Sequence, residues 1–115
     1  MKKFLVLFLT PVAVLENWMN TEESERKPVE DKMKIDWAMW MEKHKDAIVE
    51  MPAGAGKTKK ISQDGVTDIK NEVMMYGVVQ AESPEAAAEL FVGHPHLDIP
   101  EGTIEVMTIN PMAMN

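Results

Sequence analysis

The segment His94-Pro-His-Leu-Asp98 holds the side chains of this chain that are best suited to chemistry. In an extended segment, residues two apart face the same side, so His94, His96 and Asp98 are expected to converge. One hypothesis is an acid–base pair, in which Asp98 orients the imidazole of His96, raises its pKa and lets His96 move the proton. The same groups also suit a metal ion such as zinc or iron, and a structural loop is the third interpretation.

A second group of functional candidates lies on one face of an expected long helix. Trp37, Trp40 and His44 are spaced three and four residues apart, which is the helical period. Such a stripe of large side chains usually belongs to the core, but it can also form the wall of a pocket. We expect Trp37, Trp40 and His44 to contact a ligand together with His94, which should be the more exposed of the two loop histidines.

The segment Gly54-Ala-Gly-Lys-Thr58 matches the end of a phosphate-binding loop. The full motif needs glycine where Met51 stands, with a strand before it and a helix after it, and the expected elements are in the wrong order. We therefore expect no nucleotide binding. Lys57, Lys59 and Lys60 still form a local positive spot that either protects an edge strand or attracts an anionic ligand.

These candidate residues are positioned by elements that hydrophobic periodicity and turn residues predict. Phe4–Leu9 and Val73–Val79 are apolar at consecutive positions, as in strands that are covered on both faces. In chain order, the expected elements are a strand at Phe4–Leu9, a short helix capped by Thr10, a long helix from Pro28 to about Val49, a loop at 51–56 and an edge strand at Thr58–Ser62. Val66–Ile69 either extends that strand pairing or returns it. There follow a strand at Val73–Val79, a helix capped by Ser83 and stopped by Gly93, a strand at Thr103–Ile109 and a frayed tail at 110–115.

The order of these elements is strand, helix, strand, strand, helix, strand. Two such units with right-handed crossovers predict an α+β, ferredoxin-like fold, in which helices cover one face of a four-stranded antiparallel sheet. The central strands are apolar on both sides, so the second face needs a cover as well. In a chain this short, a second copy is the simplest cover, and the sequence therefore predicts a homodimer that forms a dimeric α/β barrel.

Composition narrows the class of protein further. The chain has 115 residues and no cysteine, which predicts a single domain over residues 1–115 without disulfides. Its 12 Lys and Arg against 19 Asp and Glu give a net charge of -7, which disfavours nucleic acid and anionic membranes as partners. The apolar run at Phe4–Leu9 is too short for a membrane span and lacks a cleavage site, so we expect a cytoplasmic protein.

Five segments carry a family resemblance: MKKFLVLFLTP, WAMWMEKHK, QDG, YGVVQAESPEAAAELF and HPHLDIPEGTIEVMTI. They resemble the YCII-related proteins of the dimeric α/β-barrel superfamily over almost the whole chain. The resemblance implies two subunits packed sheet on sheet, with a cavity between sheet and helices in each subunit. The superfamily includes cofactor-independent monooxygenases, isomerases and proteins without a known reaction.

These observations lead to two functional hypotheses. The first is a homodimer that binds a small organic ligand between sheet and helices, with proton transfer by His96 and without a metal or a bound cofactor. The alternative is a non-catalytic binding or assembly module on the same scaffold. An empty interior behind Trp40 and His44 favours the first hypothesis, and a packed interior favours the second.

Overall fold

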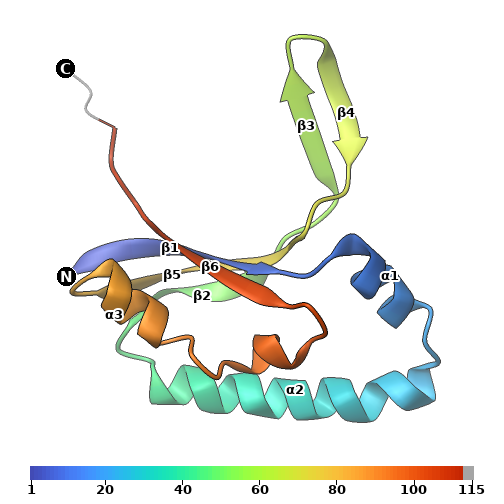
Figure 1. Ribbon diagram of the computed structural model, residues 1–115, viewed down its shortest axis with the longest axis horizontal. Coiled ribbons are helices and arrows are strands. Elements are labelled where there is room, and N and C mark those ends of the chain that lie inside the picture. The colour runs from blue at the N-terminus through green and yellow to red at the C-terminus, as the bar shows by residue number, and fades with distance from the viewer. Residues whose placement is uncertain (113–115) are drawn as a thin grey trace.

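Strand β1 (Lys2–Leu9) lies in the middle of a four-stranded antiparallel sheet, as its two-sided apolar sequence predicts. The computed structural model describes residues 1–112. Strand β1 pairs with β5 (Val73–Ala81) on one side and with β6 (Thr103–Thr108) on the other, and β2 (Ile48–Gly54) adds to β5. Figure 1 shows α2 (Glu23–Lys43) and α3 (Pro84–Glu89) on one side of this sheet and α1 (Val12–Met19) beyond its end. This arrangement confirms the predicted α+β class and antiparallel sheet.

Three α-helices and one short 3₁₀ helix accompany the sheet. The side chain of Ser83 accepts a hydrogen bond from the backbone of Ala86 at 3.1 Å, which confirms the predicted cap. Gly93 adopts a φ of 76°, the left-handed conformation with which the turn after the third helix ends. The helices are α1 (Val12–Met19), α2 (Glu23–Lys43), α3 (Pro84–Glu89) and the 3₁₀ helix η1 (Pro95–Asp98).

The predicted start of both N-terminal helices was wrong. Helix α2 begins at Glu23, so Pro28 lies inside it on an exposed face rather than at its first turn. The carbonyl that loses its hydrogen bond at the proline can bond to water there. Thr10 does not cap α1; it is 2% exposed, and its backbone N–H donates to the carbonyl of Glu72.

The predicted continuation of the long helix to Val49 and the predicted loop at 51–56 were also wrong. Helix α2 ends at Lys43, and Ile48–Gly54 forms the edge strand β2. Pro52 has no N–H for a sheet ladder, but an edge strand tolerates it where the strand is irregular. The pairing of β2 with β5 does shift register on both sides of Glu50.

The predicted edge strand at Thr58–Ser62 is a strand, but it does not belong to the sheet. It forms β3 (Thr58–Ser62), which pairs only with β4 (Gly65–Ile69) in a separate two-stranded hairpin. Figure 1 shows this hairpin standing away from the side of the sheet that the helices leave uncovered. Its turn falls at the predicted Gln63–Gly65, where Gly65 has a φ of 117°.

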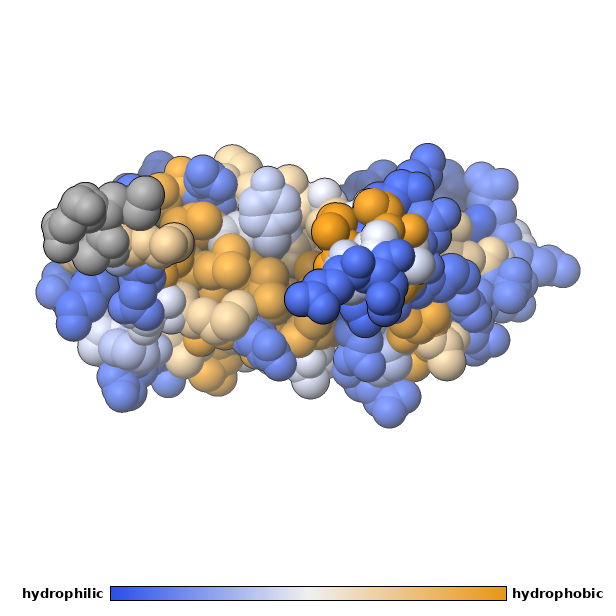
Figure 2. Space-filling view, turned by 90° about the horizontal axis from the view of Figure 1, so that it is seen from above, coloured by the Kyte–Doolittle hydropathy of each residue, from blue (hydrophilic) through white to orange (hydrophobic). Residues whose placement is uncertain are grey.

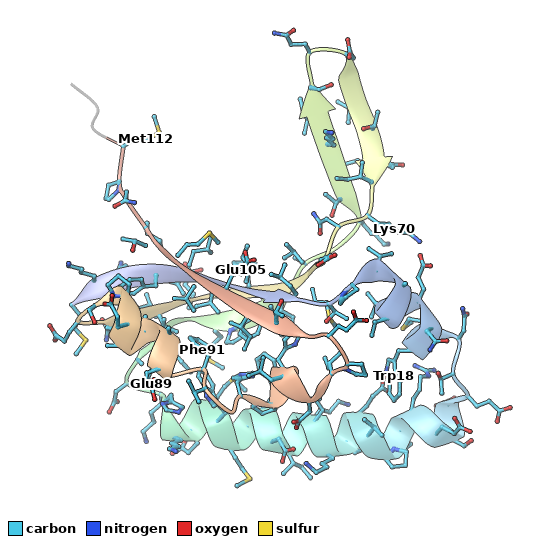
Figure 3. All side chains as sticks on the ribbon, viewed as in Figure 1. Trp18, Lys70, Glu89, Phe91, Glu105 and Met112 are labelled. Atoms are coloured by element: carbon cyan, nitrogen blue, oxygen red, sulfur yellow. The ribbon has the colours of Figure 1, made fainter. Side chains whose placement is uncertain are left out.

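The two faces of the sheet have different surroundings. The helix side holds the core, and alternate residues of the same strands form an uncovered apolar surface on the other side (Figures 2 and 3). We call this surface the open-face patch. The core consists of Phe4, Val6, Phe8, Trp40, Val79, Ala81, Ala87 and Phe91, and the open-face patch of Leu5, Leu7, Tyr76, Val78 and Met107.

The expected frayed tail at 110–115 falls partly outside the part of the chain that the structure describes, because that part ends at Met112.

At the other end of the sheet, Trp18 joins α1 to α2 (Figure 3), where its indole N–H donates to Glu30 at 3.1 Å. This bond fixes α1 beside the beginning of α2.

Candidate functional site

The predicted site residues of α2 and of the histidine segment meet between the sheet and the helices. The ring of His94 lies 4.5 Å from that of Trp37 and 4.7 Å from that of Trp40, with edge-to-face geometry in both contacts. Phe8 of β1 packs 5.4 Å from His94 and 5.6 Å from His96. The structure therefore brings the predicted aromatic and imidazole side chains together in one cluster.

His94 uses one ring nitrogen to start η1. Its Nδ1 accepts a hydrogen bond from the backbone N–H of His96 at 2.9 Å, so a neutral ring carries its proton on Nε2. That nitrogen has no hydrogen-bond partner in the described structure, and the residue is 1% exposed. Burial, with smaller contributions from His96 and His44, lowers the pKa of His94 to about 4, which keeps the ring neutral near pH 7.

His96 is bound to the backbone rather than to Asp98. Its Nε2 donates to the carbonyl of Leu9 at 2.8 Å, because a carbonyl oxygen can only accept. Burial lowers its pKa, and hydrogen bonds to the backbone of Leu9 and Thr103 partly oppose that shift. This direction is opposite to the predicted rise in its pKa, and the predicted pairing with Asp98 is not seen. The predicted greater exposure of His94 was wrong, because both histidines are 1% exposed.

The predicted convergence of three side chains fails because the segment is not extended. Pro95–Asp98 forms a 3₁₀ helix, so residues two apart no longer face the same side. Asp98 is exposed, and its charge acts on Lys32 of α2. There the pKa of Lys32 is raised mainly by its hydrogen bond and charge attraction with Asp36, and to a smaller extent by Asp98.

The interior behind Trp40 is almost filled. The cavity that borders Phe8, Trp40 and Phe91 has a volume of about 10 Å³, enough for about one water molecule. Trp40 stacks on Phe91 at 5.0 Å and donates its indole N–H to the carbonyl of Leu90 at 3.0 Å. His44 follows the end of α2, with its ring 4.7 Å from Trp40, and burial and the charge of Lys43 lower its pKa.

Residues 1–112 lack the features of two further classes of site, a metal site and a membrane-spanning helix. In that part of the chain, no three His, Asp or Glu side chains lie close enough together to hold a metal ion. No helix there combines the length and apolar composition needed to cross a membrane.

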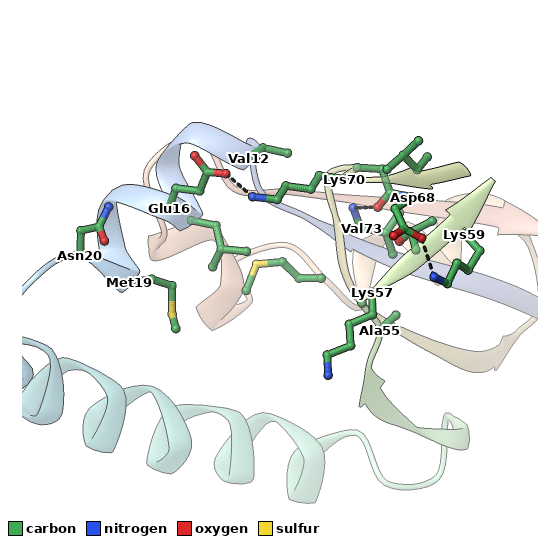
Figure 4. A pocket seen from close by; sticks show the side chains of 16 residues that line it. Val12, Glu16, Met19, Asn20, Ala55, Lys57, Lys59, Asp68, Lys70 and Val73 are labelled. Carbon is green, nitrogen blue, oxygen red and sulfur yellow. Dashed lines mark hydrogen bonds and ion pairs between the residues drawn. The ribbon is translucent and has the colours of Figure 1, made fainter. Parts of the chain in front are cut away.

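A much larger hollow lies between α1 and the base of the hairpin (Figure 4), and we call it the α1–hairpin cleft. Its volume is about 840 Å³. Two ion pairs border it, one between Lys70 and Glu16 at 2.7 Å and one between Lys59 and Asp68 at 2.5 Å. The lining residues are Val12, Leu15, Glu16, Met19, Asn20, Ala55, Gly56, Lys57, Thr58, Lys59, Asp68, Ile69, Lys70, Asn71, Val73 and Met74.

Sequence reasoning found only the basic side of this cleft. The local positive charge of Lys57 and Lys59 was the available signal. The contribution of α1 was missed because the hairpin was expected to lie in the sheet, where its base would not face Glu16 or Met19.

Comparison with known proteins does not indicate a function. No protein-family model matches the chain, and a search of the curated proteins finds no match.

Proposed function

We propose that this chain acts as a homodimeric, non-catalytic binding module, with a ferredoxin-like subunit that pairs sheet to sheet in a dimeric α/β barrel. The observation that carries the proposal is the contrast between the two faces of the sheet. On the helix side the interior is filled around Trp40, with a remaining cavity of about 10 Å³. On the other side the open-face patch has no cover within the described chain.

The open-face patch supports pairing with a second copy. Its members come from the adjacent strands β5, β1 and β6, so they form one continuous surface rather than scattered residues. Tyr76 is 40% exposed and Met107 is 38% exposed. Full burial of an exposed side chain of this kind contributes about 1.5–3 kcal/mol, so each of these partly exposed side chains would stabilise an assembly by about 0.5–1 kcal/mol. Glu105 on the edge strand β6 can stay at the polar rim.

The experiment is multi-angle light scattering on the eluted protein at micromolar concentration. We expect twice the chain mass of 13.0 kDa. Leu7→Glu should give a folded monomer, because the new carboxylate lies on the open face beside its register partner Glu105, which adds repulsion. Ile35→Glu is the matched control on the exposed surface of α2 and should remain dimeric.

Two results would contradict the proposed dimer. One is a wild-type chain that elutes as a monomer of 13.0 kDa across the micromolar range. The other is dissociation by Ile35→Glu together with an intact Leu7→Glu dimer, because that outcome would place the interface on α2. Far-UV circular dichroism on each variant separates loss of pairing from loss of folding.

The competing function is proton transfer by His96 with Asp98, and one observation next to His96 favours an interior that accepts a ligand. The Nε2 of His94 and the Oγ1 of Thr10 are both buried without a hydrogen-bond partner in the described structure, as in a site that awaits a ligand or water. An NMR titration of the histidines decides between the two functions. The binding module predicts a His96 pKa below its usual value that does not change in Asp98→Asn, whereas the acid–base pair predicts a raised pKa that falls in this variant.

A further inference from the structure

We propose that the α1–hairpin cleft binds a small organic monoanion, a carboxylate attached to an aromatic or branched apolar body, with Lys57 as its cationic partner. The inference deepens the binding role proposed above by naming a site and a ligand class. It rests on that role but not on the dimer, since every residue that lines the cleft belongs to one chain.

The charges around the cleft select a single anionic group. Lys70 is paired with Glu16, and Lys59 is paired with Asp68 across the hairpin. Within residues 1–112, Lys57 makes no ion pair, and Figure 4 shows its side chain apart from the two dashed pairs. One unpaired cation beside two carboxylates attracts a monoanion, whereas a nucleotide with several phosphate charges would be repelled by Glu16 and Asp68.

The opposite wall of the cleft is apolar. Leu15 and Met19 line it from α1, one helical turn apart, and Val73 and Met74 line it from the start of β5. Methionine side chains adapt to ligand shape, so this wall suits an aromatic or branched body more than a sugar or a polyol. An apolar wall that faces one charged group is the usual design of a site for small amphipathic acids.

The backbone conformation at Lys57 supports this assignment. Lys57 has a φ of 56°, a left-handed conformation that favours glycine and costs free energy with any other side chain. The chain places glycine next to it, at Gly56, where an added Cβ would meet nothing within 4 Å. Stability alone would favour glycine at position 57, where φ is positive, and a residue with a side chain at position 56. The chain has the reverse arrangement, and backbone strain of this kind is often found at binding sites.

The test is an NMR titration of nitrogen-labelled protein with phenylacetate and with its uncharged amide, phenylacetamide. We expect saturable shifts from phenylacetate at backbone positions of α1 and of residues 55–58, and affinity for phenylacetamide about tenfold lower. Lys57→Gly should weaken phenylacetate about tenfold and leave phenylacetamide unchanged. The same variant should not lower the thermal unfolding midpoint, because glycine relieves the strained φ.

Lys60→Ala is the matched control, because it removes the same charge from the same hairpin but from a residue outside the cleft lining. It should bind phenylacetate within about twofold of wild type, since a distant exposed charge is screened. The proposal is overturned by equal affinity for acid and amide, by no saturable shifts, or by equal weakening in Lys60→Ala and Lys57→Gly. Light scattering on the same samples tests the proposed dimer independently of this site. A monomer that binds phenylacetate through Lys57 contradicts only the dimer. A dimer that shows no saturable shifts contradicts only this site.

Discussion

The imidazole of His94 combines aromatic packing with hydrogen bonding, which a purely apolar ring could not do at this position. It packs between Trp37 and Trp40 as an aromatic side chain, and its Nδ1 accepts the hydrogen bond that begins η1. His96 adds the second polar contact of the cluster, from its ring to the end of β1 at Leu9. The two rings therefore tie a short helix to a central strand, which is a structural use of groups that also suit catalysis.

Protonation of His94 should destabilise the fold in mild acid. Its pKa is about 4 in the folded chain against 6.5 for the ordinary group, so the unfolded chain binds the proton first as the pH falls. The free energy of unfolding should be highest above pH ~6.5 and fall by about 3 kcal/mol by pH ~4 from this group. Urea unfolding at a series of pH values measures the change.

His94→Asn tests the assignment of that pH dependence. The Asn oxygen can still accept the hydrogen bond from His96, but it does not titrate. The variant should be less stable at neutral pH because the side chain is smaller, and its stability should vary less with pH in the acid range. His44→Asn, at the half-buried histidine next to Trp40, should keep most of the wild-type slope. A His94→Asn slope equal to that of wild type would assign the acid sensitivity to other groups.

The sequence predicted which aromatic and imidazole side chains gather in this cluster, but not that Asp98 stays outside it or how the histidines are bonded. The helical spacing of Trp37 and Trp40 required one shared face, and the order of elements required β1 to lie against that face. The bonding depends on the 3₁₀ turn that Pro95 begins. That turn has a sequence signal, a proline at the first helical position, but histidine is an unusual N-cap and the signal was missed.

At the scale of elements, the central strands were predictable and the edge was not. Continuous apolar residues in β1 and β5 require cover on both sides, and that requirement places them in the middle of a sheet. Strand β2 carries Pro52 and Gly54, which usually mark a loop. A strand tolerates these two residues only at the edge of a sheet. Whether a strand lies at the edge depends on the tertiary structure, which local propensity does not predict.

Gly102 fixes the connection from η1 to β6. A Cβ at this position would lie 2.8 Å from the carbonyl oxygen of His96 and 3.1 Å from that of Ile99. Both carbonyls accept backbone hydrogen bonds within the same turn, so they cannot move freely. Gly102→Ala should lower the free energy of unfolding by about 1–3 kcal/mol in urea titrations.

Gly54→Ala is the control for that substitution, because an added Cβ there meets nothing within 4 Å. It should change stability by no more than about 0.5 kcal/mol. Equal losses in Gly54→Ala and Gly102→Ala would show that the contact with η1 does not set the cost, because backbone entropy by itself favours alanine over glycine.

At the scale of the whole molecule, the chain is far from spherical. Its extents are 54 × 45 × 19 Å, the hairpin projects from the sheet, and only one face of the sheet is covered by helices (Figure 1). A molecule of this shape buries less apolar surface than a sphere of the same mass, so a single subunit has a small core for its length. In the proposed dimer, burial of the second face would add to the stability of each subunit.

If the dimer supplies that stability, unfolding should depend on protein concentration. Each tenfold increase in concentration should raise the thermal unfolding midpoint by about 3–5 °C, because association favours the folded state by mass action. Scanning calorimetry over a hundredfold range measures this shift, and Leu7→Glu should abolish it. A midpoint that stays constant in the wild-type chain would show that the subunit is stable by itself.

The hairpin also determines where the chain can accept new sequence. Its two ends are held side by side at the sheet, where the backbone N–H of Ala55 donates to the carbonyl of Met74 at 2.9 Å. Its tip at Gln63–Gly65 is exposed and far from the core (Figure 1). A loop with closed ends tolerates changes of length at small entropic cost, so the tip can lengthen, carry a peptide tag or host an inserted domain while the sheet keeps its register.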